Sequence, residues 1–175
     1  EKPFSYDYLK AQILSLLNNR QKEREAFSKR PFFPVQNMQM SKEDEVFMNK
    51  VIEVINANME DETFNVERMA EALCLSRSSL LRKIKTLFNM SPIDFIRLIR
   101  LKKAAELIQD GKYRVGEISY MVGFGSHSYF SKLFFKQFGM TPKDFEQQIA
   151  STRSKVRNVQ EINIEDLIQN NRANS

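Results

Sequence analysis

One pattern of two short helices joined by a tight corner occurs twice in this chain, and it constrains the fold more than any other feature. Each copy has a short helix, a corner and a second helix, at residues 66–73, 74–76 and 77–85 and again at residues 115–122, 123–126 and 127–136. In both copies a serine precedes the second helix, which contains basic residues and no acidic ones. A DNA major groove admits one α-helix, and the second helix of such a pair is the one that enters it. The repeat therefore predicts an all-α chain that reads two neighbouring grooves.

A single long helix is expected between the two copies. Ser91-Pro92 is a favourable helix start, apolar residues recur at helical spacing after it, and Gly111 ends the pattern. A helix over residues 92–109 is about 27 Å long at about 1.5 Å per residue, and one turn of B-DNA is about 34 Å. With a helix pair at each end, this strut is predicted to hold two recognition helices one turn apart on the same face of the DNA.

The distribution of charge agrees with this interpretation. The chain has a formal net charge of +5, and residues 63–150 contain 14 Lys or Arg against 8 Asp or Glu. The basic excess therefore lies on the repeated helix pairs, where contact with phosphates requires it. A basic surface also suits an anionic membrane or an acidic protein, so a helical protein-interaction module that binds an acidic partner is the alternative interpretation.

The single cysteine excludes an internal disulfide framework and favours a reducing compartment, so the expected location is the cytoplasm. No apolar run approaches the roughly 20 residues of a membrane span. Cys74 is expected to fill the corner of the first helix pair as a small buried residue, and a thiol-based DNA repair activity is the competing interpretation. One histidine and one cysteine predict no catalytic residues and no metal site. No cofactor and no small-molecule ligand are expected.

The chain is predicted to contain a folded domain between less regular segments. Pro31 and Pro34 break any helix, because proline lacks a backbone donor and disfavours helix in the residue before it. The expected segments are an amphipathic helix ending near 27 (residues 1–27), a linker (28–40), the double helix-turn-helix domain (41–150) and a polar tail (151–175).

In the first copy, Leu80 and Ile84 belong to the face of the second helix that must pack in the core. On the opposite face, Arg82 has a planar fork that suits guanine or a phosphate, and Leu81 suits a thymine methyl group. The predicted base contacts are Ser78, Leu81 and Arg82, and the predicted phosphate contacts are Arg77, Lys83 and Lys85. Considered alone, this helix also fits an ordinary solvated basic face.

In the second copy, Phe130 and Phe134 are predicted to pack in the core. Ser128, Ser131 and Lys132 lie on the opposite face, and Lys136 is the predicted phosphate contact. His127 stands near the N-terminus of the helix, where it suits a base or a phosphate. His127 fits a solvated residue of the first helical turn about equally well. Phe135 falls near the exposed side of the helix, and it is expected to pack against the final helix of the domain.

Residues of both copies resemble the signature of the AraC/XylS family of transcription regulators. The second copy carries it in Val122-Gly123-Phe124, Ser128-Tyr129-Phe130-Ser131-Lys132 and Phe138-Gly139-Met140-Thr141-Pro142, and the first in Ser76-Arg77-Ser78-Ser79-Leu80 and Ser91-Pro92. The resemblance covers about residues 44–149 and implies a seven-helix domain with two helix-turn-helix units in successive major grooves of double-stranded promoter DNA. Carried over by position, the resemblance implies base contact by seven residues: Ser78, Leu81, Arg82, His127, Ser128, Ser131 and Lys132. Two positions depart from the family: Lys132 replaces an arginine, and Phe135 stands where a basic residue is usual.

The N-terminus has a resemblance of its own. Lys2-Pro3-Phe4 and the helix from Tyr8-Leu9 to about Arg24 are similar to the last loop and final helix of a response-regulator receiver. This resemblance implies that the chain is a piece of a hybrid two-component regulator of the kind found in Bacteroidetes, in which sensor, kinase, receiver and DNA-binding domain share one polypeptide. The full-length parent is then expected to have histidine kinase activity, and this chain is expected to have no enzymatic activity. Such regulators control carbohydrate-use genes. The parent is expected to be tethered to the inner membrane through its sensor, and to bind promoter DNA as a phosphorylation-dependent dimer.

Overall fold

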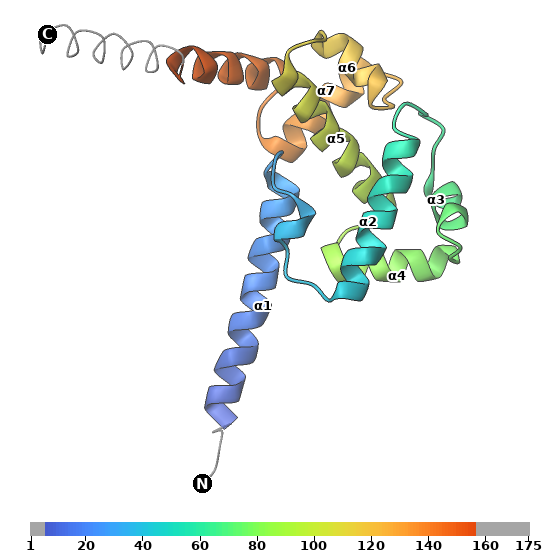
Figure 1. Ribbon diagram of the computed structural model, residues 1–175, viewed down its shortest axis with the longest axis vertical. Coiled ribbons are helices and arrows are strands. Elements are labelled where there is room, and N and C mark those ends of the chain that lie inside the picture. Colours follow the sequence, from blue (N-terminus) through green and yellow to red (C-terminus); the bar gives the residue numbers. More distant parts are fainter. Residues whose placement is uncertain (1–5, 157–175) are drawn as a thin grey trace, which may run out of the picture.

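The computed structural model describes residues 6–156, and every regular element within this range is helical (Figure 1). The elements are α1 (Tyr6–Lys29), the short 3₁₀ helix η1 (Val35–Asn37), α2 (Lys42–Ala57), α3 (Val66–Ala72), α4 (Arg77–Phe88), α5 (Pro92–Asp110), α6 (Val115–Met121) and α7 (His127–Phe138). A final helix occupies residues 142–156. The all-α class is confirmed, and α2 to α7 together with this final helix are the seven helices expected for the domain.

Side-chain caps define where the helices begin. Ser76 accepts a hydrogen bond from the backbone N–H of Ser79 at the start of α4, and Ser126 accepts one from Tyr129 at the start of α7. Such caps satisfy backbone donors that have no partner within the helix. α4 and α7 are each 12 residues long and begin at Arg77 and His127, so equivalent positions in these two predicted recognition helices are 50 residues apart.

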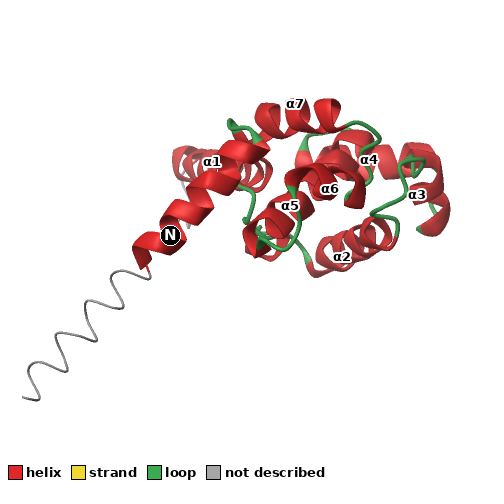
Figure 2. Ribbon diagram, turned by 90° about the horizontal axis from the view of Figure 1, so that it is seen from above, coloured by secondary structure: helices red, strands yellow, loops and turns green. Residues whose placement is uncertain are grey.

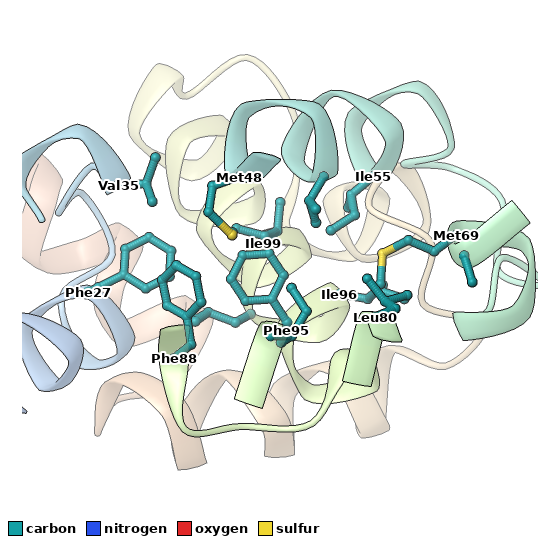
Figure 3. Close-up of a cluster of buried hydrophobic side chains, with 14 of the residues drawn as sticks. Phe27, Val35, Met48, Ile55, Met69, Leu80, Phe88, Phe95, Ile96 and Ile99 are labelled. Atoms are coloured by element: carbon teal, nitrogen blue, oxygen red, sulfur yellow. The ribbon is translucent and has the colours of Figure 1, made fainter. Parts of the chain in front are cut away.

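α5 is shared by two hydrophobic cores, one for each helix pair. Its first half contributes Phe95, Ile96, Leu98 and Ile99 to a core that also contains residues of α2, α3 and α4 (Figure 3). Its second half contributes Leu101, Ala104, Ala105 and Ile108 to a core with α6 and α7. Figure 1 shows α3 and α4 at one end of α5, with α6 and α7 around the other. The predicted strut is therefore the common centre of the domain.

Arg100, near the middle of α5, joins the two halves through backbone atoms. Its guanidinium donates to the carbonyl of Gly123 at 2.9 Å, in the corner of the second helix pair. It also donates to the carbonyls of Asp61 at 2.6 Å and Asn58 at 3.3 Å, in the loop that leads into the first. The side chain is 6% exposed, and burial lowers the pKa of Arg100. One buried cation thus fixes both helix pairs to the same strut.

Gly123 is required by this arrangement. Its φ of +77° lies in the left-handed region, and a Cβ there would come within 2.5 Å of the Met59 carbonyl oxygen and 2.7 Å of Arg100 Cζ. A side chain at this position would displace both groups. The close approach of the second corner to the α2–α3 loop therefore depends on a residue without a Cβ.

The end of α1 is part of the first core. Phe27 is 2% exposed, and its ring centroid lies 5.1 Å from that of Phe88 and 6.2 Å from that of Phe95. Lys102 Nζ lies 4.4 Å above the Phe27 ring, and burial lowers the pKa of Lys102 to about 8. Residues 6–22 of the same helix are exposed, and Figure 2 shows α1 extending away from the packed helices. Only the last turns of α1 are therefore integral to the domain.

Residues 28–40, expected as a linker, pack against the domain. Val35 and Met38 are buried, and Lys102 donates to the carbonyls of Arg30 at 2.8 Å and Phe33 at 3.1 Å. The prolines end α1 as expected, but the apolar residues after them turn the chain back onto the core. α1 itself ends at Lys29 instead of residue 27. The final helix continues past residue 150 into the expected tail, and residues 157–175 of that tail lie outside the described residues.

Arg100→Ala is expected to lower the free energy of unfolding by about 2–4 kcal/mol, because it leaves three carbonyls without their shared donor. Arg97→Ala is the matched control on the same helix, since Arg97 makes only an exposed pair with Asp94 at 3.3 Å. Its effect is expected to stay within about 0.5 kcal/mol. Urea unfolding followed by circular dichroism measures both. Equal effects of the two substitutions would contradict the role given to Arg100.

Candidate nucleic-acid interface

α4 separates its residues into a packed face and an outward face, as predicted. Leu80, Ile84 and Phe88 are buried, because they recur at helical spacing on the side that meets α2, α3 and α5. The predicted base-contacting residues Ser78, Leu81 and Arg82 are all exposed, with Leu81 49% exposed. Arg82 makes no hydrogen bond or ion pair with any other described residue. Its five donors are therefore available to a ligand.

α7 has the same two faces. Phe130 and Phe134 are fully buried, whereas the predicted base-contacting residues His127, Ser128 and Lys132 are exposed and Ser131 is half-buried. Lys136, the predicted phosphate contact, is also exposed, and neither it nor Lys132 forms an ion pair within residues 6–156. The seven predicted base-contacting residues thus lie on two equivalent helix faces.

The predicted phosphate contacts of the first unit have different surroundings. Arg77 pairs with Glu67 at 2.9 Å, with side chains 71% and 52% exposed. Such an exposed pair contributes little and is readily exchanged for a phosphate. Lys85 Nζ lies 3.4 Å from the Asn89 carbonyl at the end of α4. Lys83 instead lies 4.6 Å above the ring of Phe47 in α2, so it points away from the Ser78–Arg82 face.

The end of α1 contacts both candidate recognition helices. Arg24 donates to the carbonyls of Leu87 at 2.8 Å and Thr86 at 2.5 Å, in the last turn of α4. A cation there satisfies carbonyls without helical partners and faces the negative end of the helix dipole. The side-chain amide of Gln137 in α7 donates to the Ser28 carbonyl at 2.7 Å. The sequence does not predict these contacts, because Arg24 belongs to the polar stretch of residues 18–25.

Two expectations about this surface are wrong. Cys74 is exposed, with a φ of +54°, because it occupies the left-handed position of the first corner, which Gly123 fills in the second. Phe135 is 55% exposed, and it is not among the residues of the second core, to which the final helix contributes Phe145 and Ile149. That helix presents Phe145 instead, whose ring lies 5.6 Å from Phe134 and 5.8 Å from Phe32.

Residues 6–156 offer neither a cluster of metal ligands nor a membrane-spanning helix. In this range no group of three or more His, Cys, Asp or Glu residues is placed to hold a metal ion. No helix within the same residues is both long and apolar enough to cross a membrane. The two outward helix faces remain the strongest candidate site in the described part of the chain.

The chain is similar in sequence to known proteins. Residues 69–148 match the family model described as a helix-turn-helix domain. The chain is 36% identical over 147 residues to a histidine kinase, P4, from Formosa agariphila, covering 84% of this chain and 11% of that protein. It is 36% identical over 81 residues to the HTH-type transcriptional activator RhaS from Salmonella arizonae, covering 46% and 29% of the two chains. The chain thus spans less than a third of either relative.

A solved structure is similar as well. The C-terminal domain of AraT, a response regulator from Geobacillus stearothermophilus, superposes with a TM-score of 0.53 at 28% sequence identity. The similarity covers 63% of this chain and 88% of that domain.

Proposed function

Because residues 69–148 form a helix-turn-helix DNA-binding domain of the AraC type, we propose that α4 and α7 are its recognition helices and read adjacent major grooves. The observation that carries this proposal is the equivalence of the two helices. Each is 12 residues long, contains no acidic residue, and presents an outward face with a cation that makes no ion pair within residues 6–156, Arg82 in α4 and Lys132 in α7. The buried strut α5 holds them in one domain.

Base readout is assigned to one face of each helix. Ser78 and Ser128 are small enough for the backbone to approach the groove floor, Arg82 suits guanine, and Leu81 suits a thymine methyl group. The complete set of proposed base contacts is Ser78, Leu81, Arg82, His127, Ser128, Ser131 and Lys132. Phosphate contact is assigned to Arg77, Lys85 and Lys136, which flank these faces. Lys83 can contact a phosphate only if its side chain moves away from the Phe47 ring.

The chain acts as the DNA-binding part of an AraC-type transcription regulator. We propose further that it is the output domain of a hybrid two-component system that controls carbohydrate-use genes. The similarity to a histidine kinase and to the C-terminal domain of a response regulator supports this proposal. In the proposed system, kinase and receiver domains precede α1 in the same polypeptide, and the DNA-binding domain works in the cytoplasm as a dimer on promoter DNA.

Base and phosphate contacts are distinguishable by substitution. Arg82→Ala is expected to weaken binding to a selected site by about 1–3 kcal/mol and to relax the preference at one base pair. Lys136→Ala is expected to weaken binding to all sequences alike. The slope of log affinity against log salt concentration is expected to fall by the amount that corresponds to about one phosphate contact. Fluorescence anisotropy over a salt series, with matched and mismatched duplexes, separates the two effects.

Two results would contradict these assignments. Unchanged sequence preference in Arg82→Ala would remove α4 from base readout. Equal affinity for all DNA sequences, with complete loss of binding at higher salt, would leave only nonspecific electrostatic attraction. That outcome would restore the interpretation of the basic face as a docking surface for an acidic protein.

The proposed dimer requires the parent protein. Phosphorylation of its receiver is expected to increase both its apparent mass in gel filtration and its affinity for a repeated promoter site, because two linked domains bind two sites with a raised effective concentration. An unphosphorylatable variant of the receiver aspartate is the control. Phosphorylation that leaves oligomeric state and affinity unchanged would refute this part of the proposal.

A further inference from the structure

Phe135 presents a large apolar ring to solvent from the middle of α7. It is 55% exposed, and it makes no aromatic or cation–π contact with any other described residue. The neighbouring phenylalanines of the same helix, Phe130 and Phe134, are fully buried. The fold therefore accounts for these two but gives Phe135 no packing role.

Phe135 lies on the helix face already assigned to base readout. Ser128, Ser131, Lys132 and Phe135 are spaced i, i+3, i+4 and i+7, which places all four on one side of an α-helix. Base-contacting residues of homeodomain recognition helices have this same spacing. A side chain in the third turn is therefore within reach of the base edges when the first two turns contact them.

The equivalent position of the first unit has different chemistry. Position 135 in α7 corresponds to Lys85 in α4, since the two helices are offset by 50 residues. The Lys85 ammonium suits a phosphate, whereas a phenyl ring offers neither charge nor a hydrogen bond. Phe135 also lies between Lys132 and Lys136, two exposed cations that suit a polyanion. The charge around the ring thus favours DNA over an apolar protein surface.

We infer that Phe135 is a specificity-determining residue that contacts the 5-methyl group of a thymine in the groove occupied by α7. In the major groove only thymine presents an apolar group, and phenylalanine is one of the side chains that contact it. The other base edges present donors and acceptors there, and the ring would leave these without partners at a cost in affinity. This inference rests on the proposed function, because it requires that α7 enter a major groove.

The thymine methyl group can be deleted from the DNA without changing base pairing. A selected binding site is synthesised with deoxyuridine in place of each thymine in turn, and the affinity of the 175-residue chain is measured for every duplex. Loss of the contacted methyl is expected to weaken binding about fourfold, the value of burying one such group. In Phe135→Ser the same replacement is expected to change nothing. The same series of duplexes measured with Leu81→Ser identifies any thymine methyl group that α4 contacts instead.

Val46→Ser is the matched control, because Val46 is also an apolar residue with 55% exposure but lies on α2. It is expected to retain the full methyl dependence. Thermal unfolding of each variant checks that the fold is intact, and the exposure of Phe135 predicts little change.

The outcomes separate this inference from the proposed function. If the chain prefers its selected site but no deoxyuridine replacement weakens binding in the α7 half, Phe135 does not read thymine and the proposed function stands. Persistence of the methyl dependence in Phe135→Ser also overturns the inference. If no sequence is preferred at all, both fail. Association of the free chain that Phe135→Ser abolishes, without methyl dependence, would assign the ring to contact with a second copy.

Discussion

The arrangement of the two proposed recognition helices, α4 and α7, depends on one buried guanidinium. Arg100 donates to carbonyls of Asn58 and Asp61 ahead of the first helix pair and to the carbonyl of Gly123 within the second. Buried carbonyls that lose a charged donor are costly, so this contact resists opening. The glycine corner permits the approach, and the two cores on either half of α5 support it. The helix pairs are therefore held as one body.

Helix α1 contacts both α4 and α7. Phe27 fills the first core beside Phe88, Arg24 caps the end of α4, and Ser28 receives a hydrogen bond from Gln137 of α7. The end of α1 is thus joined to the last turns of both proposed recognition helices. Displacement of α1 would alter the support of α4 and α7 together.

Local signals were sufficient to predict most of the fold from the sequence. Caps such as Ser76 and Ser126 located the recognition helices, and the spacing of Leu80 and Ile84 identified a buried face, because each signal lies within a few residues. The packing of Phe27 on Phe88 was not predictable, since it joins positions about 60 residues apart. For Cys74 and Phe135, the general tendency of such residues to be buried was misleading. Cys74 occupies a backbone conformation that turns it outward, and Phe135 lies on the face that the proposed function leaves open.

The central claim is that a rigid strut fixes the distance between two DNA-reading surfaces. The most direct test is the affinity of the chain for a selected site whose two halves are moved apart by zero, two or five inserted base pairs. Half-sites centred about 10–10.5 base pairs apart are expected to bind best, because this separation places both grooves on one face of the helix. Five inserted base pairs turn one half-site to the opposite face, and affinity is expected to fall to that of a single half-site. Equal affinity at all three spacings would contradict the account.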